Sequence, residues 1–328
     1  MKRYYQILVL VGILALACNK PLNEEQQSEP VATISQRQCA TNEVFQQQLQ
    51  ADPSLQQRME AIEAFTRHFR ENPNAERLLP SGTMEVPVVV NVLYRTASEN
   101  ISLGQIQSQI DVLNEDFSGR NDDVSNTPSV FQGALAGNTA IRFVLENVVR
   151  KQTNRRSWPI NDAMKKSQMG GIDPTNPTTT LNVWVCNLGQ NLLGYAQFPG
   201  GNPQTDGIVV LYSAFGSREK YPQGTYISPY DLGRTATHEV GHYFNLRHIW
   251  GDATCGDDFV GDTPVHTSYN FGCPPFPKNS TCGGVTHPMM TMNYMDYTDD
   301  PCMFMFTSGQ KIRMQATYAI GGPRETLR

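Results

Sequence analysis

The hydrophobic positions of this chain change their spacing several times, and each change marks a different segment. Near the N-terminus two basic residues precede an apolar run from Ile7 to Ala17, which is typical of a secretory signal and too short for a membrane-spanning helix. The next stretch is rich in Gln, Glu, Pro and Ser and has little apolar surface to bury. We therefore predict a signal peptide over residues 1–18 and a flexible tether over residues 19–38.

Helical spacing of apolar residues begins after the tether. Between Asn42 and Arg77 this spacing is interrupted at Asp52-Pro53, so the stretch predicts two helices. A Pro-Ser-Gly sequence then breaks the chain at residues 80–82. We place a domain boundary there, with a small helical unit over residues 39–80 and one larger domain over residues 81–328.

The larger domain alternates strand-like and helix-like patterns. Apolar, β-branched runs predict strands and amphipathic runs predict helices, one of them with Ser102 as its N-cap. The predicted strands cover residues 86–94, 140–149, 181–188 and 207–212, and the predicted helices cover residues 101–117, 231–244 and 310–318. The residues between the last two helices are rich in Gly, Asp, Pro and Cys and show little periodicity. We predict an α+β fold, with an α/β-type upper subdomain built on a twisted mixed sheet and a loop-rich C-terminal subdomain.

Composition and charge narrow the function classes. The chain has 39% hydrophobic and 17% charged residues and a formal net charge of -5, which is ordinary for a globular protein. No run of Lys and Arg accompanies aromatic residues, which excludes the nucleic-acid-binding class. The apolar N-terminal run ends in Leu-Ala-Leu-Ala before Cys18, a sequence that resembles the lipidation signal of bacterial lipoproteins. We expect export, either with lipidated Cys18 as a cell-surface or outer-membrane anchor or, alternatively, as a secreted protein with an ordinary cleaved signal.

The strongest chemical signal is the sequence HEVGHYFNLRH from residues 238 to 248. On a helix His238 and His242 share one face, so both imidazoles can bind one metal ion, and Glu239 lies beside the open coordination position. The third imidazole, His248, reaches that ion only if the helix ends and the chain turns back, which requires a positive φ at Asn245. Three imidazoles with an open position are typical of a catalytic zinc site rather than a structural one.

Together with this motif, several segments resemble the pappalysin family of the metzincin clan. They are VPVVV from Val86, LLGYAQFPGG from Leu192, DGIVV from Asp206, GDTP from Gly261 and NYMDY from Asn293. The resemblance covers about residues 83–320. It implies a zinc metalloendopeptidase with a metzincin-like catalytic domain and a Met-turn, and we interpret the helical unit over residues 39–80 as the propeptide of a latent zymogen.

The family resemblance also implies a mechanism. Met295 would form an apolar floor beneath the three histidines. One zinc ion held by these histidines would lower the pKa of a bound water toward ~7 and polarise a peptide carbonyl. Glu239 would take the proton of that water and pass it to the leaving amine. Tyr297 would donate a hydrogen bond to the tetrahedral oxyanion, with a buried structural tyrosine as the alternative.

Proteins or peptides are the expected substrates. The segment Leu193, Gly194, Tyr195 and Ala196 resembles the edge strand of the active-site cleft, to which an extended peptide can add as a further strand. In relatives that cut before Lys or Arg, we expect an acidic residue directly after the last cysteine at the base of the primed-side pocket, where this chain has Met303. An apolar floor disfavours a cationic side chain, so we predict that basic specificity is lost or weakened toward apolar residues.

The 7 cysteines fit an oxidising compartment. The resemblance implies the disulfides Cys255–Cys282 and Cys273–Cys302, although the residues alone leave three pairings open. Cys39 resembles a cysteine switch, in which a thiolate occupies the open zinc position until the propeptide is removed. The alternative for Cys39 is a disulfide with Cys186.

A second metal site is suggested by the acidic loop that follows the zinc motif. Asp258, Asp262 and Thr263 would supply oxygen ligands to a calcium ion, as in similar proteins, or they form a solvated acidic loop. The sequence as a whole predicts an exported, monomeric zinc metalloendopeptidase. The alternative function is a catalytically inactive, zinc-stabilised surface binding lipoprotein, and the retention of Glu239 speaks against it.

Overall fold

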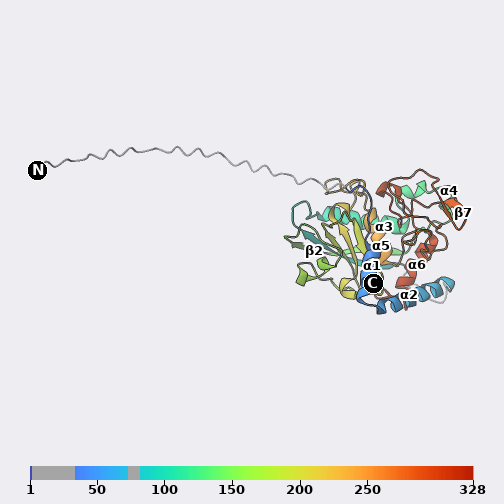
Figure 1. Cartoon of the computed structure of the whole chain (residues 1–328), viewed down its shortest axis with the longest axis horizontal. Coiled ribbons are helices and arrows are strands. Elements are labelled where there is room, and N and C mark those ends of the chain that lie inside the picture. The colour runs from blue at the N-terminus through green and yellow to red at the C-terminus, as the bar shows by residue number, and fades with distance from the viewer. Residues whose placement is uncertain (2–33, 73–81, 328) are drawn as a thin grey trace. The chain divides into compact units, whose positions relative to one another are not determined.

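The protein is described by a computed structural model that covers residue 1, residues 34–72 and residues 82–327 (Figure 1). The predicted signal peptide with Cys18, most of the tether and the predicted domain boundary near residue 80 lie outside the described residues. Within the described ranges, no helix has both the length and the apolar character needed to cross a bilayer.

A mixed sheet forms the centre of the larger domain (Figure 1). It has five strands in the order β2-β1-β3-β5-β4. The strands are β1 (Met84–Tyr94), β2 (Ile141–Gln152), β3 (Leu181–Cys186), β4 (Gly194–Ala196) and β5 (Ile208–Leu211). The first four in this order pair in parallel, and β4 runs antiparallel to β5. The four strands predicted from apolar runs are present, and the α+β prediction with a mixed sheet is confirmed.

Burial explains why the central strands could be predicted from the sequence. β1 and β3 lie inside the sheet with helices and loops on both faces, and all six residues of β3 are buried. Parallel strands that are covered on both faces read as continuous apolar runs. The short edge strand β4 has only three residues, so it was found only through family resemblance.

Three predicted helices of the larger domain are present as α3 (Leu103–Ser118), α5 (Arg234–Tyr243) and α6 (Ser308–Tyr318). The Ser102 side chain accepts a hydrogen bond from the backbone N–H of Gln105, which confirms it as the N-cap of α3. A one-turn helix α4 (Ser129–Gln132) was not predicted. Short 3₁₀ turns lie at Asp122–Asn126, Ala163–Lys165, Ser167–Met169, Pro203–Thr205, Tyr212–Ala214 and Asp300–Cys302.

The C-terminal subdomain is rich in loops, as predicted, but it also contains a hairpin of β6 (Asn279–Cys282) and β7 (Val285–Pro288). The hairpin turn is Gly283-Gly284, both with positive φ, as a two-residue hairpin loop requires. The disulfides Cys255–Cys282 and Cys273–Cys302 are present, which confirms the predicted pairing. Cys39 and Cys186 are free, so the alternative of a disulfide between them is wrong.

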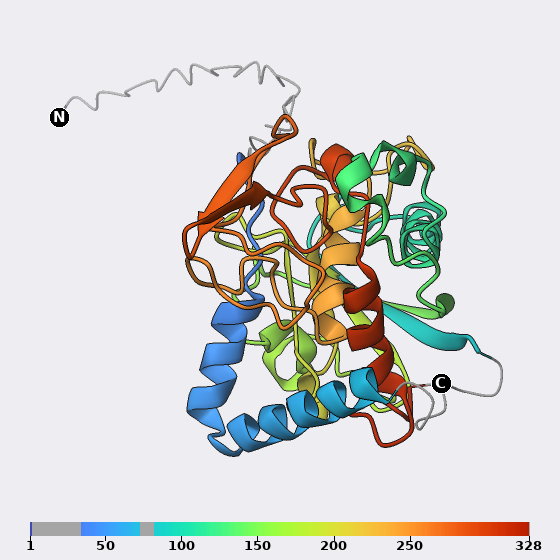
Figure 2. The same cartoon turned by 90° about the vertical axis from the view of Figure 1, so that its right-hand side faces the viewer.

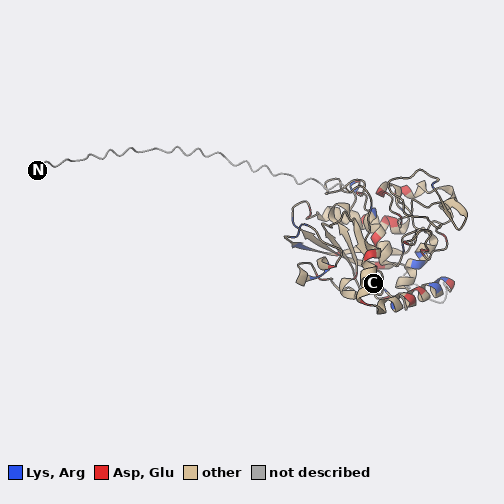
Figure 3. Cartoon of the chain, viewed as in Figure 1, with Lys and Arg blue, Asp and Glu red and all other residues tan. Residues whose placement is uncertain are grey.

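The N-terminal unit consists of α1 (Thr41–Ala51) and α2 (Ser54–Glu71), separated at Asp52-Pro53 as predicted. Both helices pack along the larger domain, with α2 beside α6 (Figure 2). The prediction of a flexible tether is wrong for its last five residues, 34–38, because Ile34 and Arg37 are buried. Basic and acidic residues are interspersed along α2 (Figure 3).

Candidate metal centre

The three predicted zinc ligands come together at the C-terminal end of α5. His238 and His242 lie one turn apart on this helix, and His248 follows after the helix has ended. Nε2 of His242 lies 3.1 Å from Nε2 of His238 and 3.1 Å from Nε2 of His248. All three side chains are buried, so their ε nitrogens face one another in a site closed to bulk water.

The turn that brings His248 back is the one that the sequence required. Asn245 has a φ of 69°, in the left-handed region where Asn is among the better tolerated residues. The backbone N–H of Leu246 donates to the carbonyl of Gly241, which closes the end of the helix. The prediction of a positive φ at Asn245 is confirmed.

Hydrogen bonds at the other ring nitrogens hold the imidazoles in one orientation. Nδ1 of His238 donates to the Tyr294 carbonyl at 2.7 Å, and Nδ1 of His242 donates to the Leu246 carbonyl at 2.8 Å. Nδ1 of His248 lies 2.5 Å from Oδ1 of Asp252. Each Nε2 therefore keeps a free lone pair. Burial also lowers the pKa of His238 and His242 well below the ordinary value, so these rings are neutral, as metal binding requires.

Met295 packs directly against the zinc helix. A Cβ atom on Gly241 would lie only 2.5 Å from Sδ of Met295, so only glycine fits at this position of the helix. The backbone N–H of Ile249 donates to the Met295 carbonyl, which ties this turn to the residue after His248. Met295 is fully buried, and its role as an apolar floor under the histidines stays a prediction.

This packing predicts the effect of Gly241→Ala. We expect the free energy of unfolding to fall by about 1–3 kcal/mol, because the added methyl group forces Met295 or α5 to move. The change in denaturation midpoint measures this loss. Gly133→Ala is the matched control, since a Cβ atom there would contact nothing within 4 Å. Equal stability of the two variants would contradict the proposed packing of Met295 on Gly241.

Cys39 is the fourth member of the cluster. Its Sγ and the ligand nitrogens of His238, His242 and His248 all lie within 4.8 Å of one another. Among the described residues this is the one group of at least three His, Cys, Asp or Glu side chains arranged to hold a metal ion. A set of three imidazoles and one thiolate suits the tetrahedral coordination of zinc.

The electrostatics of the site also favour a bound cation. Burial raises the pKa of the Cys39 thiol, and burial raises that of the Glu239 carboxyl to about 8. Both groups are therefore difficult to ionise unless a positive charge lies between them and the imidazoles. The residues present fit a zinc ion.

Glu239 faces the side of the cluster on which Cys39 lies. Its Oε2 accepts a hydrogen bond from the Thr41 hydroxyl at 3.1 Å and lies 3.3 Å from Sγ of Cys39. On the opposite side, a Cβ atom on Gly194 would come within 2.9 Å of Cγ of Glu239. A glycine at this point of β4 therefore allows the edge strand to pass close to the carboxylate.

Tyr297 closes another side of the same space. Its ring centroid lies 5.0 Å from that of His248, and its hydroxyl donates to the backbone carbonyl of Cys39 at 3.1 Å. The phenol is thus positioned to donate to a carbonyl oxygen next to the metal ligands. A catalytic role for Tyr297 stays a prediction.

The predicted substrate-binding edge of β4 is paired with the chain's own N-terminal segment. The N–H of Leu193 donates to the Gln38 carbonyl at 3.0 Å, and the carbonyl of Gly194 accepts from the N–H of Ala40 at 3.1 Å. The N–H of Ala196 donates to the Thr41 hydroxyl at 2.8 Å. The side chain of Tyr195, by contrast, is buried elsewhere and donates to Asp162.

Arg37 and Asp300 form a buried ion pair that the sequence reasoning missed. Nη2 of Arg37 lies 2.5 Å from Oδ1 of Asp300, and both side chains are almost completely buried. The guanidinium also donates to the Thr235 hydroxyl and the Thr298 carbonyl. Alternate residues of an extended chain point to the same side. The two-residue spacing of Arg37 and Cys39 therefore indicates that both side chains face the catalytic domain.

The prediction for Met303 needs correction. Met303 is fully buried in the main hydrophobic core. The acidic residue that pairs with a cationic side chain is Asp300, three residues earlier. The sequence alone did not identify it as part of a pocket. The apolar-floor argument drawn from Met303 therefore no longer carries the prediction of weakened basic specificity.

The predicted calcium loop has its polar groups engaged with the protein itself. The carboxylate of Asp258 accepts from the Thr263 hydroxyl, and burial raises its pKa to about 7. The carboxylate of Asp262 accepts from the Thr307 hydroxyl and from the N–H of Gly309. Calcium binding by these residues stays a prediction.

The fold and the buried three-histidine cluster define the class of metzincin metallopeptidases. The family model described as pregnancy-associated plasma protein-A matches residues 176–319. The chain is 31% identical over 307 residues to an extracellular metalloprotease of Colletotrichum graminicola, a match that covers 86% of this chain and 90% of that relative. The chain belongs to the pappalysin family and is a metalloendopeptidase, as its sequence predicted.

Two solved structures from Tannerella forsythia are similar to this chain. Mature mirolysin in complex with a cleaved peptide is 47% identical, with a TM-score of 0.71, and the match covers 76% of this chain and 96% of that chain. A mutant of promirolysin is 43% identical, with a TM-score of 0.76, and the match covers 86% of this chain and 94% of that chain. A metzincin-like catalytic domain is thereby confirmed for this protein.

Proposed function

We propose that this metalloendopeptidase cleaves peptide bonds that precede Arg or Lys and that the described chain is its latent form. The observation that carries the proposal is the path of the N-terminal segment. Arg37 is paired with Asp300, Cys39 lies at the three histidines, and the backbone between Gln38 and Ala40 is hydrogen-bonded to β4. The segment therefore occupies the edge strand, the metal centre and one charged pocket at once.

In the proposed mechanism His238, His242 and His248 hold a zinc ion. Zinc at such a site supplies Lewis acidity, which polarises a peptide carbonyl and makes a water molecule acidic. Glu239, whose Oε2 faces the position of the Cys39 sulfur, takes a proton from the attacking water and delivers it to the leaving amine. In the latent form the side chains of Thr41 and Cys39 lie on this carboxyl, so it becomes available to a water molecule only when the N-terminal segment leaves.

Two groups orient the substrate in this mechanism. The backbone of Leu193, Gly194 and Ala196 offers to an extended peptide the N–H and C=O groups that the N-terminal segment now uses. The hydroxyl of Tyr297, which now donates to the Cys39 carbonyl, donates instead to the carbonyl oxygen under attack. Both roles need the N-terminal segment to leave.

Specificity for basic residues follows from the ion pair at Asp300. One oxygen of this carboxylate faces Arg37, and the other accepts from the N–H groups of Leu232 and Arg234. A buried carboxylate held in this way needs a cationic partner, and an Arg or Lys side chain of the substrate would supply it once Arg37 has left.

Latency is proposed to depend on Cys39 as a fourth zinc ligand. The match to promirolysin covers a larger share of this chain than the match to mature mirolysin, which supports α1 and α2 as part of a removable pro-segment within the predicted residues 39–80. The segment also engages Glu239 through Thr41, independently of the metal. Release of the pro-segment would free both the metal and the general base.

The Cys39→Ala zymogen tests the switch. We expect it to convert to the mature form roughly tenfold faster than wild type, because the loss of a thiolate ligand weakens the seating of the pro-segment while Arg37 still holds it. Conversion is followed by gel electrophoresis and by hydrolysis of a short fluorogenic peptide. Cys186→Ala, which removes the other free buried thiol among the described residues, should leave latency unchanged. Equal latency of both variants would rule out Cys39 as the switch.

The catalytic proposal is tested with a proteome-derived peptide library. The mature protein, with and without a chelator, digests the library, and mass spectrometry identifies the cleavage sites. Cleavage that precedes Arg or Lys and is lost with the chelator supports the proposal. No cleavage by zinc-loaded mature protein would favour the inactive binding protein.

We also propose export, by a signal over residues 1–18 and with Cys18 as a lipid anchor. The relatives named extracellular metalloproteases support export. Metabolic labelling with a radioactive fatty acid tests the anchor, since Cys18→Ser should abolish incorporation. Label that persists in this variant would contradict lipidation at Cys18.

A further inference from the structure

Helix α2 rests on a face of the catalytic domain that adjoins the metal centre on the side of His242, whose ring lies 5.5 Å from that of Phe198. We call this face the α2 seat, and its residues are Phe198, Arg247, Phe259, Ile312, Arg313 and Ala316. Phe65 and Phe69 of α2 pack against Ile312 and Ala316, and Ile62 packs against Phe198. The seat thus binds an apolar stripe of one helix.

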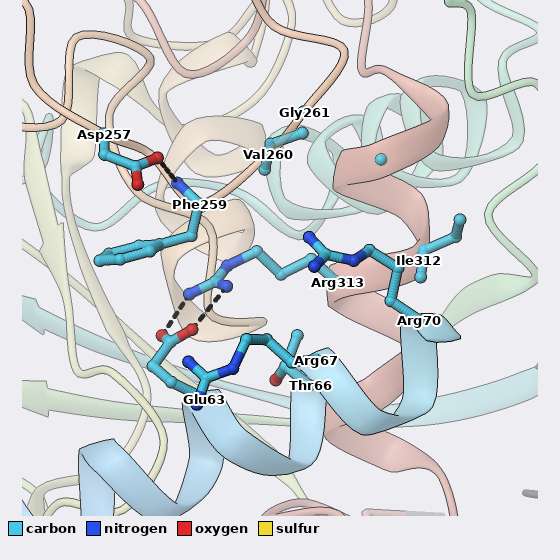
Figure 4. A pocket seen from close by; sticks show the side chains of 11 residues that line it. Glu63, Thr66, Arg67, Arg70, Asp257, Phe259, Val260, Gly261, Ile312 and Arg313 are labelled. Carbon is cyan, nitrogen blue, oxygen red and sulfur yellow. Dashed lines mark hydrogen bonds and ion pairs between the residues drawn. The ribbon is translucent and has the colours of Figure 1, made fainter. Parts of the chain in front are cut away.

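A carboxylate lies within that stripe and meets a guanidinium of the seat. Glu63 accepts hydrogen bonds from both terminal nitrogens of Arg313, one of them at 2.8 Å (Figure 4). Nε of Arg313 donates at 2.6 Å to the carbonyl of Asn245, the turn residue between the second and third zinc ligands. The seat therefore contains a cation whose place is fixed by the catalytic domain itself.

A second guanidinium lies beside the first. Arg247 is sandwiched between Phe198 and Phe45, at 4.1 Å and 5.0 Å from the ring centroids. Its Nε has no hydrogen-bond partner among the described residues, so this guanidinium keeps an unused, buried donor. Two neighbouring guanidiniums on an apolar face favour a ligand that brings a carboxylate flanked by apolar side chains.

The fit between α2 and its seat is incomplete. A cavity of about 440 Å³ remains between α2, the loop of residues 257–261 and α6. Arg67 and Arg70 of α2 line it together with Phe259 and Ile312 (Figure 4). This pocket is open to solvent, since Arg67, Arg70 and Phe259 are exposed, so the seat has room for helices with bulkier side chains than those of α2.

We propose that the α2 seat of the mature enzyme is an exosite for protein substrates that present an amphipathic helix with a glutamate among apolar residues. The proposal rests on the proposed function, because the pro-segment must leave first. α1 has 11 residues and connects the metal centre to α2, a span of about 16 Å. One substrate molecule can therefore occupy the cleft and the seat together, which raises its effective concentration at the cleft.

The test uses mature enzyme and two matched substrates. Mature mirolysin matches 76% of this chain as a folded protein, so a mature form without α1 and α2 is a suitable reagent. Each substrate joins the same cleavable peptide, by a flexible linker, to a helix with the sequence of residues 54–71. In one of them the helix carries Glu63→Lys.

We expect the wild-type helix to lower KM about tenfold relative to the Glu63→Lys helix, with kcat unchanged. Ile312→Glu in the enzyme should remove this difference and leave cleavage of the short peptide alone unchanged. Equal KM values for the two substrates would overturn the exosite. If the mature enzyme does not cleave even the short peptide, the proposed catalytic function fails instead.

Discussion

Glu239→Ala in the mature enzyme is expected to lower kcat by roughly 10²–10⁴-fold, the contribution usual for a positioned general acid and base. The carboxylate is the one acidic group on α5, and it faces the position that the Cys39 sulfur now occupies. Its loss removes the group that accepts the proton of the attacking water. Steady-state hydrolysis of a short peptide that contains Arg measures the effect.

The controls for this variant separate catalysis from metal binding. Glu239 is not among the four clustered ligands, so the zinc content of the Glu239→Ala enzyme should equal that of wild type. Glu239→Gln should be almost as inactive, since it keeps the shape but cannot take up a proton. A kcat within tenfold of wild type, in zinc-loaded enzyme, would mean that another group acts as the base.

The metal centre could be predicted from the sequence because its determinants are local. The spacing of His238 and His242 fixes them on one helical face, and the distance to His248 requires a turn that only a few residue types tolerate. Asn245 meets that requirement with a φ of 69°. The strands β1 and β3 were equally predictable, because their burial on both faces leaves continuous apolar runs.

The charged pocket could not be predicted because its partners are distant in the sequence. Arg37 and Asp300 are separated by 263 positions, and nothing local distinguishes Asp300 from its neighbour Asp299. The same holds for Thr41, whose hydroxyl reaches Glu239 across 198 positions. The family pattern pointed instead to Met303, which packs in the core because the chain turns through a 3₁₀ helix at Asp300–Cys302.

Asp300→Asn in the mature enzyme is expected to lower kcat/KM for a peptide with Arg after the scissile bond by about 10²-fold. Breaking a buried, hydrogen-bonded ion pair costs about 3 kcal/mol, and 1.4 kcal/mol corresponds to a factor of ten. The substitution keeps the size of the side chain but removes the charge that compensates a guanidinium. A matched peptide with norleucine at that position should lose less than threefold, because it brings no charge into the pocket.

Two further variants test whether the loss of kcat/KM comes from the charge of Asp300 in the pocket. Asp299→Asn changes the neighbouring carboxylate, which accepts a hydrogen bond from Tyr230, and it should leave the preference for Arg intact. In the zymogen, Arg37→Met should hasten pro-segment release, because it leaves Asp300 buried without a cation. If Asp300→Asn lowers kcat/KM equally for Arg and norleucine peptides, the carboxylate only supports the loop at Leu232 and Arg234, and basic specificity must come from elsewhere. A selective loss would mean that one carboxylate serves both latency and specificity, since the pro-segment and the substrate present the same cation to it.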